Sequence, residues 1–378
     1  MYGVLIVAVA ICLLVVAARS IRKKNIDIIA VQSLKRKRIG VEGLNHVFFC
    51  FVDHFEPFWA GADEATALER VEDWVKYYPA SVDRFRDKGG KPPIHSFFYP
   101  QEEYAPRLLD MLAELENSGY GRVEVHLHHD GDTSSSFREK INSFKETLHS
   151  RHGMLHKDPV TGTVEYGFIH GNWALDDSGI DGRWCGVKDE ITILKETGCY
   201  ADFTYPSAPH PTQPPVINRV YYATDDPKKG KSHHRGVDAA FGAAPRGDLL
   251  LITGPLAFNW QKRRRGVLPA IENGDITGVN LPTGDRIDLW IRLGISVEGW
   301  PRWIFVKVHT HGVQPKNAKL LLGERIAPMY DYLLSKYNDG KQYLTHFVSA
   351  RELYLCVKAL ESADNDWIAR IENFDYSG

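Results

Sequence analysis

The stretch 123–132 reads Val-Glu-Val-His-Leu-His-His-Asp-Gly-Asp, and its alternation of residue types is typical of a buried strand. Because side chains alternate across a strand, Glu124, His126 and His128 share one face. The three aliphatic residues between and before them share the other face, which we expect to pack against helices. Two histidines two residues apart on an interior face can bind one metal ion. The stretch therefore predicts a buried strand that ends in a metal-binding site.

Six more short segments have the apolar, β-branched or aromatic composition of strands. They span residues 47–53, 94–99, 166–170, 201–205, 249–254 and 304–309. Helical periodicity fills the intervals at 64–88, 104–118, 134–152 and 187–197. Near the end, Ser349-Ala-Arg-Glu352 is a capping box that predicts a helix through Leu360.

Strands that alternate with helices predict parallel βαβ units and an α/β fold. Seven such strands could close a barrel or form an open, doubly wound sheet. A nucleotide-binding sheet is disfavoured, because Asp53-His-Phe-Glu-Pro follows the first strand in place of a Gly-rich loop. The segment 207–246 is rich in Pro, Gly and Lys, and we expect it to be an insertion at the rim of the barrel.

Composition sets the protein class. The chain has 378 residues, of which 43% are hydrophobic and 25% charged, so it can bury a large core and is not a disordered chain. A net charge of −2 gives no case for a nucleic-acid partner. The five Cys include no C-x-x-C pair, which argues against a disulfide framework and a zinc knuckle.

The amino terminus predicts a membrane anchor. Residues 1–18 carry no charge and are just long enough to span a bilayer. No Lys or Arg precedes this run and eight follow it by residue 38, which favours an uncleaved anchor over a signal peptide. We therefore predict a single-pass helix at 1–18, a basic linker at 19–43 in solvent or against lipid headgroups, and one domain at 44–378. The charge bias predicts a cytoplasmic domain, with a periplasmic or extracellular one as the alternative.

Nearly every predicted strand ends in side chains that bind metals or move protons. In a parallel barrel, the active site lies at these carboxyl ends. Besides the residues of 123–132, the set comprises Asp53, His54, Glu56, Tyr99, Gln101, Glu102, His170, Asn172, Trp173, Tyr205, Ser207, His210, His309 and His311. Two His and a carboxylate with open positions form the ligand set of a hydrolytic zinc ion.

With these motifs the chain resembles the polysaccharide deacetylase superfamily, meaning carbohydrate esterase family 4 and its relatives on a distorted seven-stranded (β/α) barrel. The resemblance covers residues 45–315. Phe51-Val-Asp53-His-Phe-Glu56-Pro is similar to the acidic motif of the family, 124–132 occupies the place of its His motif, and Val306-Lys-Val-His309-Thr-His311 is similar to its last motif. The chain departs from the family at His54 in the Asp-Asp pair, at Asp132 in the place of a second His, and at Thr204-Tyr-Pro-Ser207.

The resemblance implies a metal-dependent hydrolase that removes N-acetyl groups from amino sugars in a polysaccharide or glycan precursor, by cleaving a linear amide C–N bond. Zinc is the favoured metal, with cobalt, nickel or manganese as alternatives. The expected ligands are Asp53, His126, His128 and Asp132, and the expected catalytic residues are Asp53, His170, His309 and His311. Substrate contacts are expected from Glu56, Tyr99, His129, Asp130, Asn172, Trp173, Tyr205 and Ser207.

Two alternatives belong to other classes. A barrel glycosidase needs two carboxyl groups on either side of the bond, and Asp53, Glu56, Asp130 and Asp132 are its candidates. That chemistry leaves the clustered histidines unexplained. A membrane-tethered glycan-binding protein without catalysis would bind sugars and tolerate substitution of His309 and His311.

Overall fold

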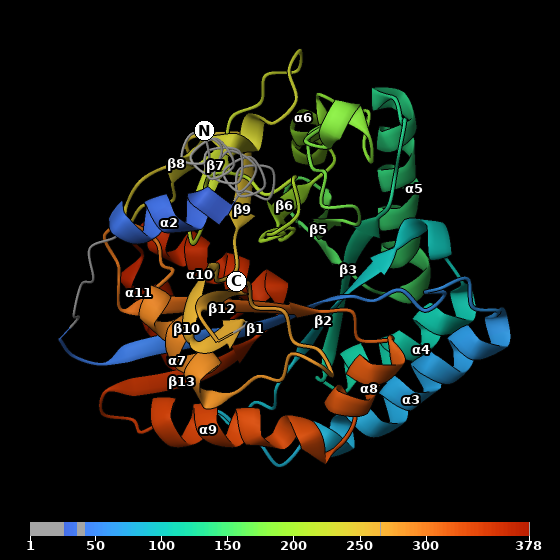
Figure 1. Ribbon diagram of the computed structural model, residues 1–378. Coiled ribbons are helices and arrows are strands. Elements are labelled where there is room, and N and C mark those ends of the chain that lie inside the picture. Colours follow the sequence, from blue (N-terminus) through green and yellow to red (C-terminus); the bar gives the residue numbers. More distant parts are fainter. Residues whose placement is uncertain (1–25, 36–41, 265, 378) are drawn as a thin grey trace, which may run out of the picture.

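The computed structural model describes residues 26–35, 42–264 and 266–377 (Figure 1). The predicted anchor at 1–18 and much of the predicted linker lie outside these residues. Within them, no helix has the length and apolar character needed to cross a bilayer. Residues of the predicted linker form α2 (Ile26–Lys35), whose Ile29 is buried with Ala208, Ile217 and Leu256. This part of the linker is therefore a packed helix.

Seven strands pair in parallel and form the main part of one large sheet (Figure 1), in the order β12-β1-β2-β3-β5-β6-β9. They coincide with the seven predicted strands, so the α/β prediction is confirmed. Their bounds are β1 (Asn45–His54), β2 (His95–Pro100), β3 (Gly121–Leu127), β5 (Val164–His170), β6 (Cys199–Asp202), β9 (Leu249–Ile252) and β12 (Trp303–Thr310).

The two faces of the sheet form separate apolar cores. On β1, Val47, Phe49 and Phe51 belong to the core shared with the outer helices, whereas Phe48, Cys50 and Val52 belong to the inner core. This is the two-residue alternation of a strand that is buried on both faces. The four outer helices that follow β1, β2, β3 and β5 contact one another in sequence.

The inner face is strongly curved. Phe98 on β2 and Phe203 just beyond β6 have ring centroids 5.6 Å apart, although β3 and β5 lie between these strands. From β12, Lys307 Nζ donates hydrogen bonds to the carbonyls of Phe203 (2.5 Å) and Tyr205 (2.6 Å). The two ends of the parallel run therefore approach each other, although no pairing joins β9 to β12 among the described strands.

The predicted helices are present, and besides α2 four further helices among the described residues were not predicted. The first group comprises α3 (Glu64–Val82), α4 (Pro106–Asn117), α5 (Ser134–His152), α6 (Glu190–Glu196) and α10 (Ala350–Ser362). The second comprises α7 (Gly284–Leu293), α8 (Pro315–Leu321), α9 (Ala327–Tyr337) and α11 (Asn365–Glu372). Short 3-10 turns are η1 (Gln101–Glu103), η2 (Ile180–Gly182), η3 (Ser232–His234) and η4 (Glu324–Ile326).

The predicted rim insertion contains regular structure. Within 207–246, β7 (Val220–Ala223) pairs antiparallel with β9 and with β8 (Val237–Asp238), so the insertion extends the sheet. Sequence analysis also missed β13 (Tyr343–Val348), β4 (His156–Lys157) and the hairpin of β10 (Ala257–Arg264) and β11 (Leu268–Glu272). β13 pairs with the first half of β1, along the edge that β2 continues.

The predicted capping box is confirmed at the start of α10, where Ser349 and Glu352 bond reciprocally to each other's backbone N–H. We expect Ser349→Ala to lower the free energy of unfolding by about 1 kcal/mol, because a backbone N–H loses its acceptor. Urea denaturation measures this change. Ser335→Ala in α9 is the control, because the exposed Ser335 hydroxyl only donates a hydrogen bond, to the carbonyl of Tyr332 (3.1 Å). It should shift the free energy of unfolding by less than about 0.5 kcal/mol. Equal effects of the two substitutions would contradict the capping argument.

Candidate metal centre

One carboxylate, Glu56, lies among four histidine rings at the carboxyl ends of β1, β3 and β12. Glu56 Oε1 is 3.4 Å from His126 Nε2 and 3.3 Å from His128 Nε2, and Oε2 is 3.7 Å from His311 Nδ1. The ring of His54 stacks on His311, with centroids 4.6 Å apart, and meets His126 edge-on at 4.9 Å. We call these five residues the Glu56 cluster.

The alternation of side chains along β1 and β3 brings the residues of the cluster together. His54 continues the inner-facing series of Phe48, Cys50 and Val52 on β1, and Glu56 follows in the turn beyond the strand. On β3, His126 faces inward and His128 follows the strand end, as the alternation predicts. His54, Glu56 and His126 are buried, whereas His128 and His311 keep 34% and 21% of their side chains exposed. The cluster is therefore reachable from one side.

Hydrogen bonds at the far ring nitrogens set the tautomers of two histidines. His126 Nδ1 lies 3.1 Å from the carbonyl of Ile169, which can only accept, so Nδ1 carries the proton. His128 Nδ1 lies 2.5 Å from Glu102 Oε1, which also accepts when ionised. In the neutral rings, both Nε2 atoms then have a lone pair directed at Glu56, and His126 Nε2 has no hydrogen-bond partner. A carboxylate that holds its histidine ligand in this way is typical of metal sites.

Two lone pairs and a carboxylate that converge require a positive charge between them. Without a metal, a proton supplies it: desolvation lowers the pKa of His128, but its hydrogen bonds to Glu102 and Glu56 outweigh that effect and raise the pKa to about 10. Burial acts to raise the pKa of Glu56, yet its close contacts with the rings of His126, His128 and His311 hold the pKa well below its usual value. A divalent cation would replace the proton on His128, so we expect metal binding to release a proton.

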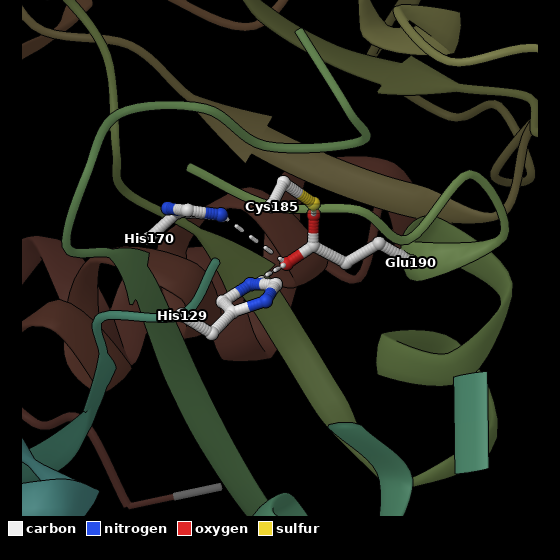
Figure 2. A group of neighbouring side chains, drawn as sticks. All are labelled: His129, His170, Cys185 and Glu190. Carbon is white, nitrogen blue, oxygen red and sulfur yellow. Dashed lines mark hydrogen bonds and ion pairs between the residues drawn. The ribbon is translucent and has the colours of Figure 1, made fainter. Parts of the chain in front are cut away.

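A second carboxylate, Glu190, lies in a neighbouring buried group with His129, His170 and Cys185 (Figure 2). Its Oε1 is 3.2 Å from His129 Nε2 and 3.9 Å from His170 Nε2, and its Oε2 accepts hydrogen bonds from Cys185 Sγ (3.3 Å) and the N–H of Asp176 (2.5 Å). We call this set the Glu190 cluster.

By donor type and spacing, the Glu190 cluster and two groups that share Glu56 could each hold a metal ion, within the part of the chain that the structure describes. The tautomer of His170 distinguishes the Glu190 cluster from the groups that contain Glu56. Its Nδ1 accepts hydrogen bonds from the N–H groups of Asn172 (3.2 Å) and Ala174 (3.4 Å), so in the neutral ring Nε2 carries a proton. Glu190 thus accepts from a backbone N–H and a thiol and faces a protonated ring nitrogen, whereas Glu56 faces the lone pairs of His126 and His128 when these rings are neutral.

Asp53, predicted to be a ligand and base, lies elsewhere. It belongs to the outward-facing series of β1, where its carboxylate contacts His95 Nε2 (2.8 Å) and accepts a hydrogen bond from the N–H of Gly312 (2.6 Å). A Cβ at Gly312 would lie only 2.1 Å from Asp53 Oδ2. Asp53 therefore holds the turn that carries His311, and it does not reach the Glu56 cluster.

Three more of the predicted site residues, Asp132, Asp130 and Tyr99, form hydrogen bonds outside the Glu56 cluster. Asp132 bonds to Lys140 (2.8 Å) and faces His129 Nδ1 (3.4 Å). Asp130 accepts a hydrogen bond from the N–H of Trp184 (2.7 Å). Tyr99 is fully buried against the outer helices and donates to the carbonyl of Glu103 (2.8 Å).

The remaining predicted residues are divided between the rim and the interior. Trp173 lies beside the Glu56 cluster, with its ring 6.2 Å from His54 and 6.3 Å from His311. The ring of buried His309 is 6.5 Å from His54. Asn172, Tyr205 and Ser207 are held by His129 O, His233 Nε2 and Gln213 Oε1, respectively.

Sequence reasoning used Glu56 as a substrate contact and as a candidate glycosidase carboxylate, but not as a ligand. It placed His54 and Glu102 among the polar residues at the strand ends without a specific role, and it gave Cys185 and Glu190 no role in a site. For His54 a signal existed, because alternation along β1 sets it opposite to Asp53. For Glu190 and Cys185 none existed, since a helix turn and a loop carry them to the carboxyl ends of β3 and β5.

We expect His126→Ala/His128→Ala to lose bound zinc, because both imidazole donors of the Glu56 cluster are removed. Mass spectrometry of the purified full chain after dialysis against zinc measures the loss, and circular dichroism checks folding. His156→Ala, at an exposed histidine outside these clusters, is the control. Zinc retained in the folded double variant would exclude the Glu56 cluster as the metal site.

Glu102→Gln should weaken zinc binding roughly 10- to 100-fold, because a neutral amide holds His128 less firmly than a carboxylate. Competition with a chelating dye measures the dissociation constant. Glu103→Gln is the matched control, since the carboxylate of Glu103 accepts from the N–H of Phe58 (2.8 Å) and not from a histidine. An unchanged constant in Glu102→Gln would show that His128 is not a ligand.

In comparisons with known proteins, no family model matches the chain and no protein with a curated description is significantly similar to it. The resemblance to polysaccharide deacetylases therefore stays a prediction that depends on the motifs and on the geometry above.

Proposed function

We propose that the chain is a metal-dependent hydrolase that removes N-acetyl groups from amino sugars in a polysaccharide or glycan precursor. One observation carries the proposal: the Nε2 atoms of His126 and His128 converge on the carboxylate of Glu56, 3.4 and 3.3 Å from Oε1. Two imidazoles and one carboxylate leave open coordination positions, as catalytic zinc sites do. Cobalt, nickel and manganese are alternatives to zinc.

Within this proposal, a cation held by Glu56, His126 and His128 would polarise the acetyl carbonyl and lower the pKa of a water molecule. The protein residues would orient the substrate and move protons. His311 is half-buried at the open side of the cluster, and Asp53 fixes its turn through the N–H of Gly312. We assign it the proton that the leaving amine takes up, a role that suits an imidazole near neutral pH.

Aromatic side chains at the rim support a sugar substrate. The ring of Trp173 lies 5.4 Å from that of His210, which lies 5.2 Å from that of Trp184, and all three rings are partly exposed. Apolar ring faces of this kind can stack on sugar faces beside polar groups that fix orientation. The curvature of the sheet also supports a distorted seven-stranded barrel, with the cluster at the carboxyl ends of its strands.

A glycosidase is less well supported because three of its four predicted carboxylates are engaged outside the Glu56 cluster. Of the four candidates, Asp53 bonds to His95, Asp130 to the N–H of Trp184 and Asp132 to Lys140. Glu56 alone belongs to the cluster. A pair of carboxyl groups on either side of a glycosidic bond therefore cannot be assembled from these four residues in this arrangement.

The test is hydrolysis of N-acetylglucosamine oligomers by the zinc-loaded full chain, with acetate release as the readout. We expect His311→Ala to lower kcat about 10²- to 10⁴-fold, the usual contribution of a general acid, with zinc content unchanged. His156→Ala serves as the control. New reducing ends without acetate would indicate a glycosidase, and sugar binding with neither product would indicate a binding protein.

A further inference from the structure

The hairpin of β10 and β11 carries a bulge that turns side chains outward. Asn259 pairs with Ala270, but the next pair joins Arg263 to Pro269, so residues 260–262 are left without partners in the ladder. Asn259 Oδ1 accepts hydrogen bonds from the N–H groups of residues 261 (2.9 Å) and 262 (3.1 Å), which fix the bulge. Trp260 is consequently 60% exposed.

Exposed apolar side chains are concentrated here. Of the ten large hydrophobic side chains exposed in the described part of the chain, half lie between residues 260 and 281, a region that makes up a small part of the sequence. We call them the hairpin patch: Trp260, Val267, Leu268, Val279 and Leu281. Lys262 Nζ donates to Asn280 Oδ1 (2.7 Å) and so ties the segment 279–281 to the hairpin. A concentration of this kind marks an interaction surface.

Exposed cations accompany the patch. Lys262 and Arg263 are exposed beside Trp260, and neither makes an ion pair among the described residues. Tryptophan together with aliphatic side chains and Lys or Arg is the composition that suits the interface of an anionic bilayer. The charge and the apolar character of this surface therefore point to the same partner.

In the sequence, a short segment joins the uncharged run at 1–18 to helix α2, which contacts this hairpin. Helix α2 packs on the base of the hairpin, where Ile29 is buried beside Leu256, and Phe258 and Ile271 pack against the same core. Only seven residues separate Ala18 from Ile26, so these two residues can be at most about 28 Å apart when the segment is fully extended. A bilayer that receives the uncharged run would therefore lie within reach of the hairpin patch.

The base of the hairpin is fixed to the end of the sheet that carries the Glu56 cluster. Arg286 holds Glu272 at the end of β11 through two hydrogen bonds (2.7 and 2.8 Å), and Trp290 Nε1 adds a third (2.9 Å). Four residues further on, the N–H of Ile276 donates to the carbonyl of His309 (2.8 Å). The hairpin patch and the cluster consequently keep a fixed relation to each other.

We propose that the hairpin patch docks on a bilayer surface that contains anionic lipids, and that it is a second membrane contact besides the amino-terminal run. Docking would set the end of the sheet that carries the Glu56 cluster close to the bilayer. A glycan held at the membrane by a lipid would then be the substrate class. That last consequence rests on the proposed function, whereas docking itself does not.

The test places an environment-sensitive NBD label at Val267→Cys in the full chain. The four cysteines among the described residues are buried, and Cys12→Ser removes the fifth. On reconstitution into phosphatidylcholine vesicles with phosphatidylglycerol, we expect a blue shift and a several-fold rise in NBD emission. Lys262→Glu/Arg263→Glu should reduce the rise, because anionic headgroups then repel the hairpin.

Val160→Cys is the matched control. Val160 is 91% exposed in the turn before β5, at the amino ends of the parallel strands and thus opposite to the cluster, and its label should not respond. Identical emission from labels at 267 and 160 in vesicles would overturn the proposal. A response at 267 to soluble N-acetylglucosamine oligomers but not to vesicles would overturn it in favour of a glycan-binding surface.

Discussion

Pairing on both sides of β1 is the constraint on which the rest of the structure depends. β12 pairs with it along one edge, and β13 and then β2 pair along the other. A strand fixed in this way cannot rotate, and a shift of one residue would exchange its two faces. His54 therefore faces the interior and Asp53 faces the helices. The positions of Glu56 and of the turn that holds His311 follow from this choice.

Local pattern was sufficient to predict the parallel strands and most outer helices, because periodicity and capping are short-range signals. It also predicted that His126 and His128 act together. The same alternation, applied to β1, places Asp53 on the face opposite to the cluster. The similarity to the acidic motif of the deacetylase family implied instead that Asp53 is a ligand. The β10–β11 hairpin was missed for another reason: its charged, bulged strands lack the alternation that marks a strand.

The two buried carboxylates show why residue type alone does not identify a metal site. Glu56 and Glu190 each have histidines within hydrogen-bonding range, and each lies at the carboxyl ends of the strands. What differs is the partner of the opposite ring nitrogen. In the neutral rings, a carbonyl or a carboxylate leaves the lone pairs of His126 and His128 facing Glu56, whereas backbone N–H groups leave a proton on His170 facing Glu190. These partners come from distant segments, so the sequence does not reveal them.

The Glu190 cluster nevertheless helps to position the candidate metal centre, because the two clusters contain adjacent residues of the chain. His128 and His129 are consecutive residues, and beyond the end of β3 they enter different clusters. Glu190 and Asp132 hold the two nitrogens of His129 at 3.2 and 3.4 Å, while Glu102 holds both the N–H (3.1 Å) and Nδ1 (2.5 Å) of His128. Fixing one residue of this pair restricts the backbone of the other. The hydrogen-bonded Glu190 thus positions His129 next to His128, which belongs to the candidate metal centre.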